Sequence, residues 1–170
     1  MTLNIASYSD DPRARLLSTF AHTPFELVLG GGAVRCESVE GFWQGLKWPE
    51  DSPDRARVFG LWGLEAKLAG AAAPSGDVEI AGRLIPRGSA AHHALAEQAM
   101  RAKLEQNPDV REALRSTAGL RLTHDLVDER GDAVPDSLTL PKAVFVDIWM
   151  RLREELMTSA GAAHAPRLNS

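Results

Sequence analysis

The chain has 170 residues, of which 25% are charged, and a net charge of −4, which is ordinary for one soluble globular domain with its own core. This net negative charge gives no indication of a broad positively charged surface that binds nucleic acid. No apolar run approaches the roughly 18 residues of a membrane span. The single cysteine, Cys36, excludes an intramolecular disulfide and a thiolate metal cluster. Because Met1 to Asp11 lack the basic start and the apolar block of a signal peptide, we expect a cytoplasmic protein without a membrane partner.

The first regular element expected along the chain is a β-hairpin. Two apolar runs, residues 25–29 and 33–36, flank the glycines 30–32. Glycine accepts the positive φ angles of a tight turn at no steric cost, so this arrangement favours two antiparallel strands.

A helix is expected to follow the hairpin directly. Ser38 is a good N-cap, apolar side chains recur at helical spacing as far as Leu46, and Pro49 ends the helix at about Trp48. Signals of the same kind predict two further helices, over residues 52–59 and 64–69.

The C-terminal half is also predicted to be mainly helical. Ser89 starts a helix that ends near Gln106, and Asn107 caps the next helix, which has a proline in its first turn. Residues 120–123 alternate like a short strand, whereas residues 125–137 are polar and indicate a loop. The last helix is predicted from an apolar stripe made of Val144, Phe145, Ile148, Trp149, Leu152 and Leu156.

These elements predict a fold that is mainly α, within the α+β class. We expect a compact helical single domain over residues 1–157, with a small β-hairpin near its N-terminus. The tail, residues 158–170, is rich in alanine, glycine and serine and has no periodic apolar face, so it is expected to be flexible.

The helix that starts at Ser38 carries the first candidates for chemistry. Glu40, Gln44 and Lys47 form one polar stripe. At about 1.5 Å of rise per residue, Glu40 and Lys47 lie roughly 10 Å apart, so they are placed to contact two parts of one elongated ligand. The alternative is an ordinary amphipathic surface helix. Gly41 costs about 1 kcal/mol relative to alanine here, which indicates close packing or close approach of a ligand.

The same segment resembles the NADAR (YbiA-like) family. The family has a helix of the form Ser-Glu-x-Tyr-x-Gln-x-x-Lys-Phe, and residues 38–48 read Ser-Val-Glu-Gly-Phe-Trp-Gln-Gly-Leu-Lys-Trp. In place of the family's Trp-Gly-x-Gly segment, residues 124–131 read His-Asp-Leu-Val-Asp-Glu-Arg-Gly, without a tryptophan. Further family segments are matched, in the same order along the chain, by residues 17–20, 66–70, 102–108, 114–117 and 150–153.

The resemblance implies a YbiA-like fold and cleavage of the bond between a ribose anomeric carbon and a nitrogen. Such cleavage builds positive charge on the sugar, which a nearby carboxylate stabilises, and the match gives this role to Glu40. Lys47 is then the partner for a phosphate, with Gln44 also in contact with the substrate. Phe20 or Trp43 would stack a base or shape the sugar pocket.

A second carboxylate is expected from the segment before the last helix. Asp125 and Asp128 are both candidates, and the alternative for each is a turn or cap role. His124 is a candidate substrate contact and general acid, or a local hydrogen-bond partner. Arg83 and Arg87 lie in a loop before a helix start, which suits a pyrophosphate, although exposed loop arginines are common.

No metal site and no cofactor are expected. The pair His92 and His93 is the only run of adjacent histidines, and neighbouring helical residues point about 100° apart. Such side chains do not converge on one ion.

The function predicted is that of an N-glycosidase, an ADP-ribosyl glycohydrolase type of hydrolase. Its expected partner is a small molecule containing ADP-ribose or a ribosyl phosphate, or ADP-ribosylated guanine in DNA. Alternatives are an N-glycosidase of riboflavin-pathway intermediates, a non-catalytic module that binds ADP-ribose or NAD, and a protein that acts only by contact. The missing Trp-Gly segment favours a binding module, whereas Glu40 and Lys47 favour the hydrolase.

Overall fold

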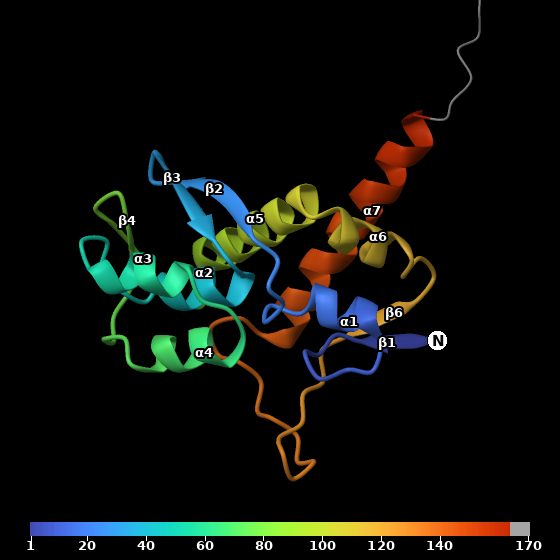
Figure 1. Ribbon diagram of the computed structural model, residues 1–170, viewed down its shortest axis with the longest axis horizontal. Helices are drawn as coiled ribbons and strands as arrows, with labels where there is room; N and C mark the ends of the chain where they lie inside the picture. The colour runs from blue at the N-terminus through green and yellow to red at the C-terminus, as the bar shows by residue number, and fades with distance from the viewer. Residues whose placement is uncertain (164–170) are drawn as a thin grey trace, which may run out of the picture.

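Short sheets and longer helices make up the computed structural model, which describes residues 1–163 (Figure 1). The elements within this range pair into three two-stranded sheets, β1 with β6, β2 with β3, and β4 with β5. One cluster of buried apolar side chains joins strands and helices from both halves of the chain, so the predicted α+β single domain is confirmed. The elements are β1 (Thr2–Asn4), α1 (Pro12–Leu17), β2 (Phe25–Leu29), β3 (Gly32–Cys36), α2 (Val39–Gly45), α3 (Pro53–Phe59), α4 (Gly63–Ala71), β4 (Val78–Ile80), β5 (Arg83–Ile85), α5 (Ala90–Gln106), α6 (Pro108–Arg115), β6 (Arg121–Thr123) and α7 (Lys142–Ala163).

The predicted N-terminal hairpin is confirmed. Strands β2 and β3 are antiparallel, with Phe25 opposite Cys36 and Leu29 opposite Gly32. Gly30 and Gly31 in the turn have φ angles of 60° and 87°, which side chains with a Cβ rarely adopt. The hairpin lies against α5, where it helps to close the core.

Helix α2 begins where it was predicted but ends earlier. Its last residue is Gly45 rather than Trp48, because the Lys47 and Trp48 amides donate to carbonyl oxygens three residues back and turn the chain. The unusual Gly41 is explained by packing. A Cβ there would overlap the carbonyl oxygen of Leu61, so the glycine lets α2 approach the backbone that follows α3.

The pairing of β1 with β6 was not predicted as such. The two strands run parallel, with Leu3 opposite Leu122, although most of the chain separates them. Helix α1 and the β4–β5 hairpin were also not predicted. Helix α1 has local signals, because Asp11 accepts from the Arg13 amide and Pro12 occupies the first turn.

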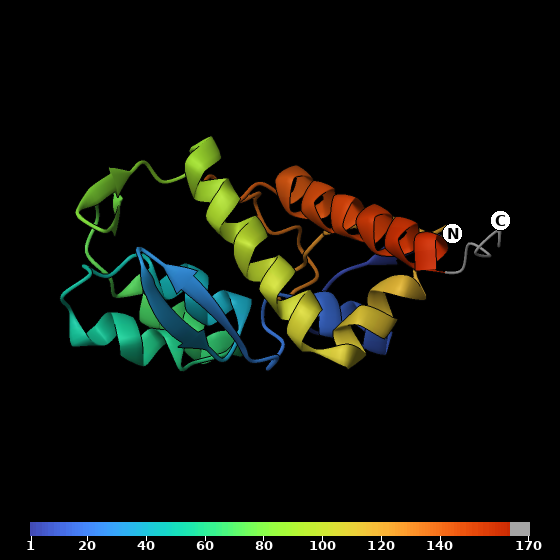
Figure 2. The ribbon, with the colours of Figure 1, turned by 90° about the horizontal axis from the view of Figure 1, so that it is seen from above.

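Helix α5 crosses the middle of the domain and contacts α7, which runs at an angle to it (Figure 2). The predicted stripe on α7 is buried over much of its length, including Phe145, Trp149 and Leu152. Asn107 does not cap α6 with its side chain as predicted, because its amide instead donates to the Pro24 and Lys103 carbonyls.

Helix α7 is longer than expected. It continues to Ala163, past the predicted domain end at residue 157, so the first part of the predicted tail is helical. Alanine, which is frequent in this stretch, is the best intrinsic helix former, which explains the extension. The rest of the predicted tail, residues 164–170, lies outside the described residues. Within residues 1–163, no helix has the length and apolar character needed to cross a membrane.

Candidate functional site

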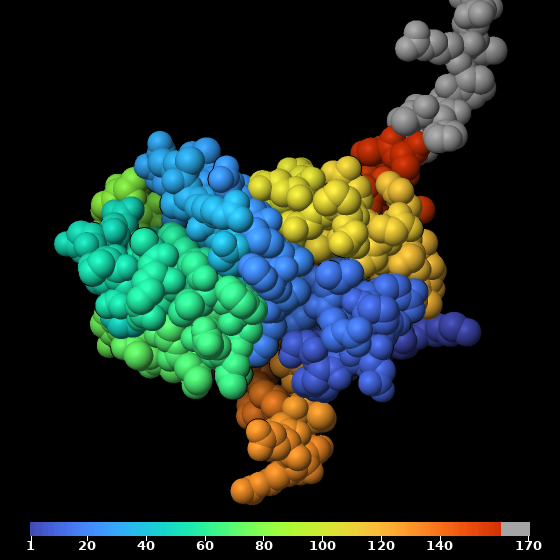
Figure 3. Space-filling model, in the orientation of Figure 1, coloured from blue at the N-terminus to red at the C-terminus, as the bar shows by residue number. Residues whose placement is uncertain are grey.

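A cavity of about 540 Å³ lies between α2, the segment after α1, the start of α4 and the irregular segment 124–141. We call residues 124–141, which join β6 to α7, the arm. Figure 3 shows the arm standing out from the body between α4 and the N-terminal segment. The volume of the cavity is within the usual range for small-molecule sites, and we call it the Glu40 cavity.

Glu40 is held rigidly in the wall of this cavity. Ser38 caps α2 by accepting from the Gly41 amide at 2.8 Å, which places Glu40 in the first helical turn. Glu40 is 8% exposed, and its two carboxylate oxygens accept from Thr19 Oγ1 at 2.9 Å and Gln44 Nε2 at 2.8 Å. The predicted catalytic carboxylate is therefore fixed in orientation and faces the cavity.

Gln44 also lines the cavity, as a partner of Glu40. Helix α4 makes room for it with Gly70, where a Cβ would overlap the Gln44 side chain. The Gln44 Oε1 atom is buried and has no donor among the described residues. Gln44, a predicted substrate contact, therefore orients the Glu40 carboxylate, whereas its own carbonyl oxygen packs against Gly70.

Both predicted aromatic contacts, Phe20 and Trp43, line the cavity. Trp43 is 7% exposed, and one face of its indole stacks on His92 with ring centroids 3.8 Å apart. That face is unavailable for stacking on a base. Phe20 is half-buried, so it offers the larger accessible aromatic surface.

His124 faces the same cavity from the arm. Its Nδ1 atom lies 2.7 Å from the carbonyl oxygen of Ile5. A carbonyl can only accept, so Nδ1 carries the hydrogen and the Nε2 atom of the neutral ring is an acceptor. Burial lowers the pKa of His124, against the opposing effects of the Ile5 bond and nearby carboxylates, so the ring is neutral at neutral pH.

The two candidate aspartates of the arm take different places. Asp128 lines the Glu40 cavity, but its Oδ1 atom accepts from the Arg130 amide at 2.8 Å and the Asp132 amide at 3.0 Å, which is a turn role. Asp125 lines a smaller neighbouring cavity of about 250 Å³. There it pairs with Lys142 at 2.8 Å, a bond that lowers the pKa of Asp125.

Lys47 and Arg87, both predicted substrate contacts, do not line the Glu40 cavity. They lie together beyond the end of α2, where Arg87 Nη2 donates to the Lys47 carbonyl oxygen at 3.3 Å. Because α2 ends at Gly45, the predicted helical stripe is interrupted before Lys47. Arg83 is an exposed residue of β5 and is not part of this group.

The cavity also contains residues that the sequence patterns did not single out. Thr19 donates to Glu40 and lies in residues 17–20, a segment that matches the family. The family match could therefore have indicated Thr19 as a site residue. Lys67 of α4 lies in the matched segment 66–70. Tyr8 accepts from the Val127 amide at 2.8 Å and links the arm to the N-terminal segment, and no local pattern indicates it.

Within residues 1–163, no three histidine, cysteine, aspartate or glutamate side chains are placed to hold a metal ion. The arrangement that is present suits acid–base chemistry instead. A fixed carboxylate and a neutral imidazole line one cavity, together with the hydroxyl of Thr19 and the ammonium of Lys67.

Three comparisons with known proteins bear on this site. A sequence profile of the family described as Bacteriophage protein GP30.3 matches residues 12–154 of the chain. No curated protein matches the sequence. Among solved structures, the NMR structure of the E. coli protein YbiA matches with a TM-score of 0.65 and 22% sequence identity, over 99% of this chain and 91% of that chain. The predicted YbiA-like fold is therefore confirmed.

Proposed function

The chain belongs to the Bacteriophage protein GP30.3 family and has a YbiA-like fold, and from this premise we propose that it is a hydrolase that cleaves an N-glycosidic bond in an ADP-ribose or ribosyl-phosphate substrate. We further propose that it is a divergent member of the NADAR superfamily. The substrate we favour is ADP-ribose linked to a nucleobase, such as guanine in DNA. Riboflavin-pathway ribosides are the other substrate class, because such a small metabolite and an ADP-ribosylated base in DNA both contain a bond between ribose and nitrogen.

The observation that carries the proposal is the fixed orientation of the Glu40 carboxylate at the cavity wall. Thr19 and Gln44 each hold one carboxylate oxygen, so the group keeps its place without substrate. A preorganised negative charge stabilises positive charge that develops on a sugar in the transition state. The proposed reaction needs such a group next to the anomeric carbon.

In the proposed step, the bond between C1 of the ribose and the nitrogen breaks, and its electron pair leaves with the nitrogen. Glu40 stabilises the positive charge on the ribose and orients a water molecule, whose oxygen bonds to C1. The neutral His124 ring accepts a proton from this water at Nε2 and passes it to the leaving nitrogen. Water is consumed, and the products are the free sugar and the free base.

A second function, a binding module without turnover, is favoured by the arm. The arm lacks the family's Trp-Gly segment, and its cavity-lining Asp128 is engaged in a turn. Both functions use the same cavity. They differ in whether Glu40 affects bond cleavage or only affinity.

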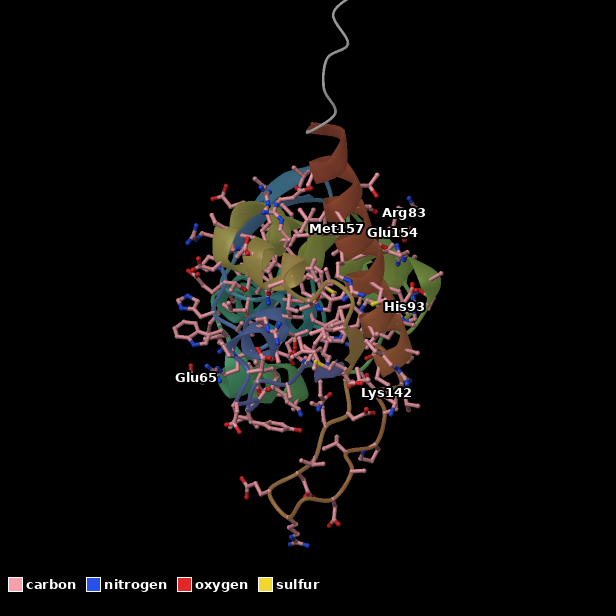
Figure 4. The ribbon with its side chains drawn as sticks, turned by 90° about the vertical axis from the view of Figure 1, so that its right-hand side faces the viewer. Glu65, Arg83, His93, Lys142, Glu154 and Met157 are labelled. Atoms are coloured by element: carbon pink, nitrogen blue, oxygen red, sulfur yellow. The ribbon has the colours of Figure 1, made fainter. Side chains whose placement is uncertain are left out.

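The deciding experiment measures release of free ADP-ribose from DNA that carries ADP-ribosylated guanine. We compare the wild type with Glu40→Gln and with Glu65→Gln, an exposed glutamate on α4 that is not among the cavity residues (Figure 4). We expect release that falls by about 100-fold or more in Glu40→Gln and is unchanged in Glu65→Gln.

Three other results change the conclusion. Release that survives Glu40→Gln rejects the role of Glu40. ADP-ribose that raises the melting temperature without any release supports the binding module. No release and no thermal shift rejects both ADP-ribose functions and leaves the riboflavin-pathway ribosides as the substrates to assay.

A further inference from the structure

A fully buried lysine lies behind the wall of the Glu40 cavity. Lys103, in the last turn of α5, donates from its Nζ atom to the carbonyl oxygen of Ser18 at 2.7 Å. The same Nζ atom lies 5.8 Å from the centre of a ring of Trp149 on α7. Ser18 is the residue that ends α1, and residues 18–20 line the cavity. Lys103 therefore joins α5 to a segment of the cavity wall.

Lys103 is costly for the core to keep. Lysine is almost never fully buried without a partner of opposite charge, because water solvates an ammonium far better than apolar side chains do. Burial alone lowers the pKa of Lys103 to about 7, so no carboxylate compensates its charge. A methionine would fill the same space without this cost. Packing therefore does not explain why an amine occupies this position.

The Ser18 carbonyl oxygen does not need Lys103 to be paired. It also accepts from the Ala21 amide at 3.3 Å, in the turn that follows α1. One donor is enough to avoid the cost of a buried carbonyl without a hydrogen bond. The bond from Lys103 is a second and shorter one, and it holds the peptide group that joins Ser18 to Thr19.

This peptide group leads directly to the contacts of the Glu40 carboxylate. Thr19 Oγ1 donates to one carboxylate oxygen of Glu40 at 2.9 Å, and the Glu40 amide donates to the Thr19 carbonyl oxygen at 3.0 Å. Thr19 is thus bonded to Glu40 through both its side chain and its backbone. A displacement of the peptide group between Ser18 and Thr19 would disturb both bonds, because each depends on distance and angle.

From this geometry we propose that Lys103 is a positioning residue, which fixes the orientation of the Glu40 carboxylate through Ser18 and Thr19. Lys103 is fully buried and does not line the cavity, so it does not contact a substrate there. Its effect on hydrolysis rests on the proposed function, in which misplacing a catalytic group by about 1 Å lowers the rate constant. Its effect on Glu40 is a property of the free protein and is measurable without a substrate.

The first measurement is amide hydrogen exchange, followed by NMR in the wild type and in Lys103→Met. We expect the Glu40 amide, which is bonded to Thr19, to exchange roughly tenfold faster in the variant. The melting temperature at pH 7 is expected to be equal to that of the wild type or higher, because an apolar group replaces a buried amine. Faster exchange at undiminished stability is a local effect, which a loss of general packing does not produce.

Two further variants serve this measurement. Met100→Leu, a substitution of similar volume one turn earlier in the buried face of α5, is the control and is expected to leave exchange of the Glu40 amide unchanged. Lys103→Leu removes the same donor with another apolar side chain and is expected to reproduce the result of Lys103→Met. The conclusion then does not depend on how one variant folds.

The second measurement follows release of ADP-ribose from DNA that carries ADP-ribosylated guanine. Lys103→Met is expected to lower kcat roughly tenfold and to change KM less than about twofold, because the lysine touches no substrate. Thr19→Val breaks the same chain of contacts next to Glu40. In the double variant we expect a loss no greater than that of the more damaged single variant, whereas independent losses would multiply.

The outcomes separate this proposal from the proposed function. Unchanged exchange of the Glu40 amide in both Lys103 variants overturns the positioning role, as does equally faster exchange in Met100→Leu. Faster exchange in the Lys103 variants alone, with no release by the wild type, supports the positioning of Glu40 and rejects the proposed function. Release by the wild type with losses that multiply in the double variant keeps the function and overturns the connection through Thr19.

Discussion

The two walls of the Glu40 cavity are held by different means. The α2 wall is made of side chains that are at most 8% exposed, namely Glu40, Trp43 and Gln44. Gln44 donates to Glu40, and Trp43 stacks on His92 of α5. On the arm wall, residues 128–138 are exposed throughout, and their polar groups bond mainly to one another. The packing of the domain therefore fixes the α2 wall, whereas the arm can change in sequence at little cost to the stability of the fold.

The same contrast separates the two histidines near the cavity. His92, behind the α2 wall, accepts at Nδ1 and keeps a hydrogen on Nε2, so it is a donor. His124, on the arm side, donates at Nδ1 to Ile5 and keeps a lone pair on Nε2, so it is an acceptor. Two identical side chains thus present opposite groups at Nε2, a donor on His92 and an acceptor on His124, because a different backbone group faces each Nδ1 atom.

The largest expected effect comes from breaking the packing of the α2 wall. Gly41→Ala places a Cβ against the carbonyl oxygens of Leu61 and Val58, and a backbone carbonyl cannot move away as a flexible side chain does. We expect the free energy of unfolding to fall by more than about 3 kcal/mol, measured by urea denaturation. Gly32→Ala is the control, because a Cβ there has only the Leu29 carbonyl oxygen nearby, at 3.9 Å. Equal losses in both variants would show that α2 is not clamped at Gly41.

The next effect is a pH dependence that comes from Lys103, which holds the segment after α1. Its Nζ atom donates to the Ser18 carbonyl oxygen at 2.7 Å, and burial lowers its pKa from 10.5 to about 7. The unfolded chain binds the proton more tightly, so this contribution to stability rises as the pH rises from about 7 toward 10. We expect the wild type to gain about 2 kcal/mol relative to Lys103→Met between pH 7 and pH 9, measured by denaturation at each pH. Parallel pH profiles for the two proteins would reject the depressed pKa.

A smaller effect is expected from loosening the carboxylate without removing it. Thr19→Val keeps the shape of the side chain and removes the hydrogen bond to Glu40. We expect a loss of about 1 kcal/mol in stability and, if the proposed hydrolysis is correct, a roughly tenfold lower rate constant for ADP-ribose release. Thr158→Val on the exposed surface of α7 is the matched control. A release rate unaffected by Thr19→Val would mean that the orientation of Glu40 does not matter.

The smallest effect on stability is expected in the arm. Asp128→Ala removes the turn contacts to the Arg130 and Asp132 amides, which are exposed to solvent. We expect stability to change by less than about 1 kcal/mol, and any change in activity to appear in KM rather than kcat. A fall in kcat as large as that of Glu40→Gln would place a catalytic carboxylate in the arm and contradict the division between the walls.

Much of the fold could be predicted because its signals are local. The β2–β3 hairpin needs only two apolar runs around Gly30 and Gly31, and the start of α2 needs only Ser38 and the spacing that follows. The same is true of α5 and α7. The sequence did not predict the early end of α2 or the extension of α7 to Ala163, because element ends depend on a few weak bonds and on packing.

Residue type and spacing along the chain were enough to predict the β2–β3 hairpin and most of the helices, the family resemblance, and Glu40 as the candidate carboxylate. Which donor meets which acceptor depends on how the distant segments of the chain pack. The tertiary structure placed Thr19 on Glu40, Ile5 on His124 and the Gly88 amide on His92, and it moved Lys47 and Arg87 out of the predicted pocket into a cluster of their own. The physical reason is that a hydrogen bond depends on positions within a few tenths of an ångström, and those positions are set when distant segments pack together.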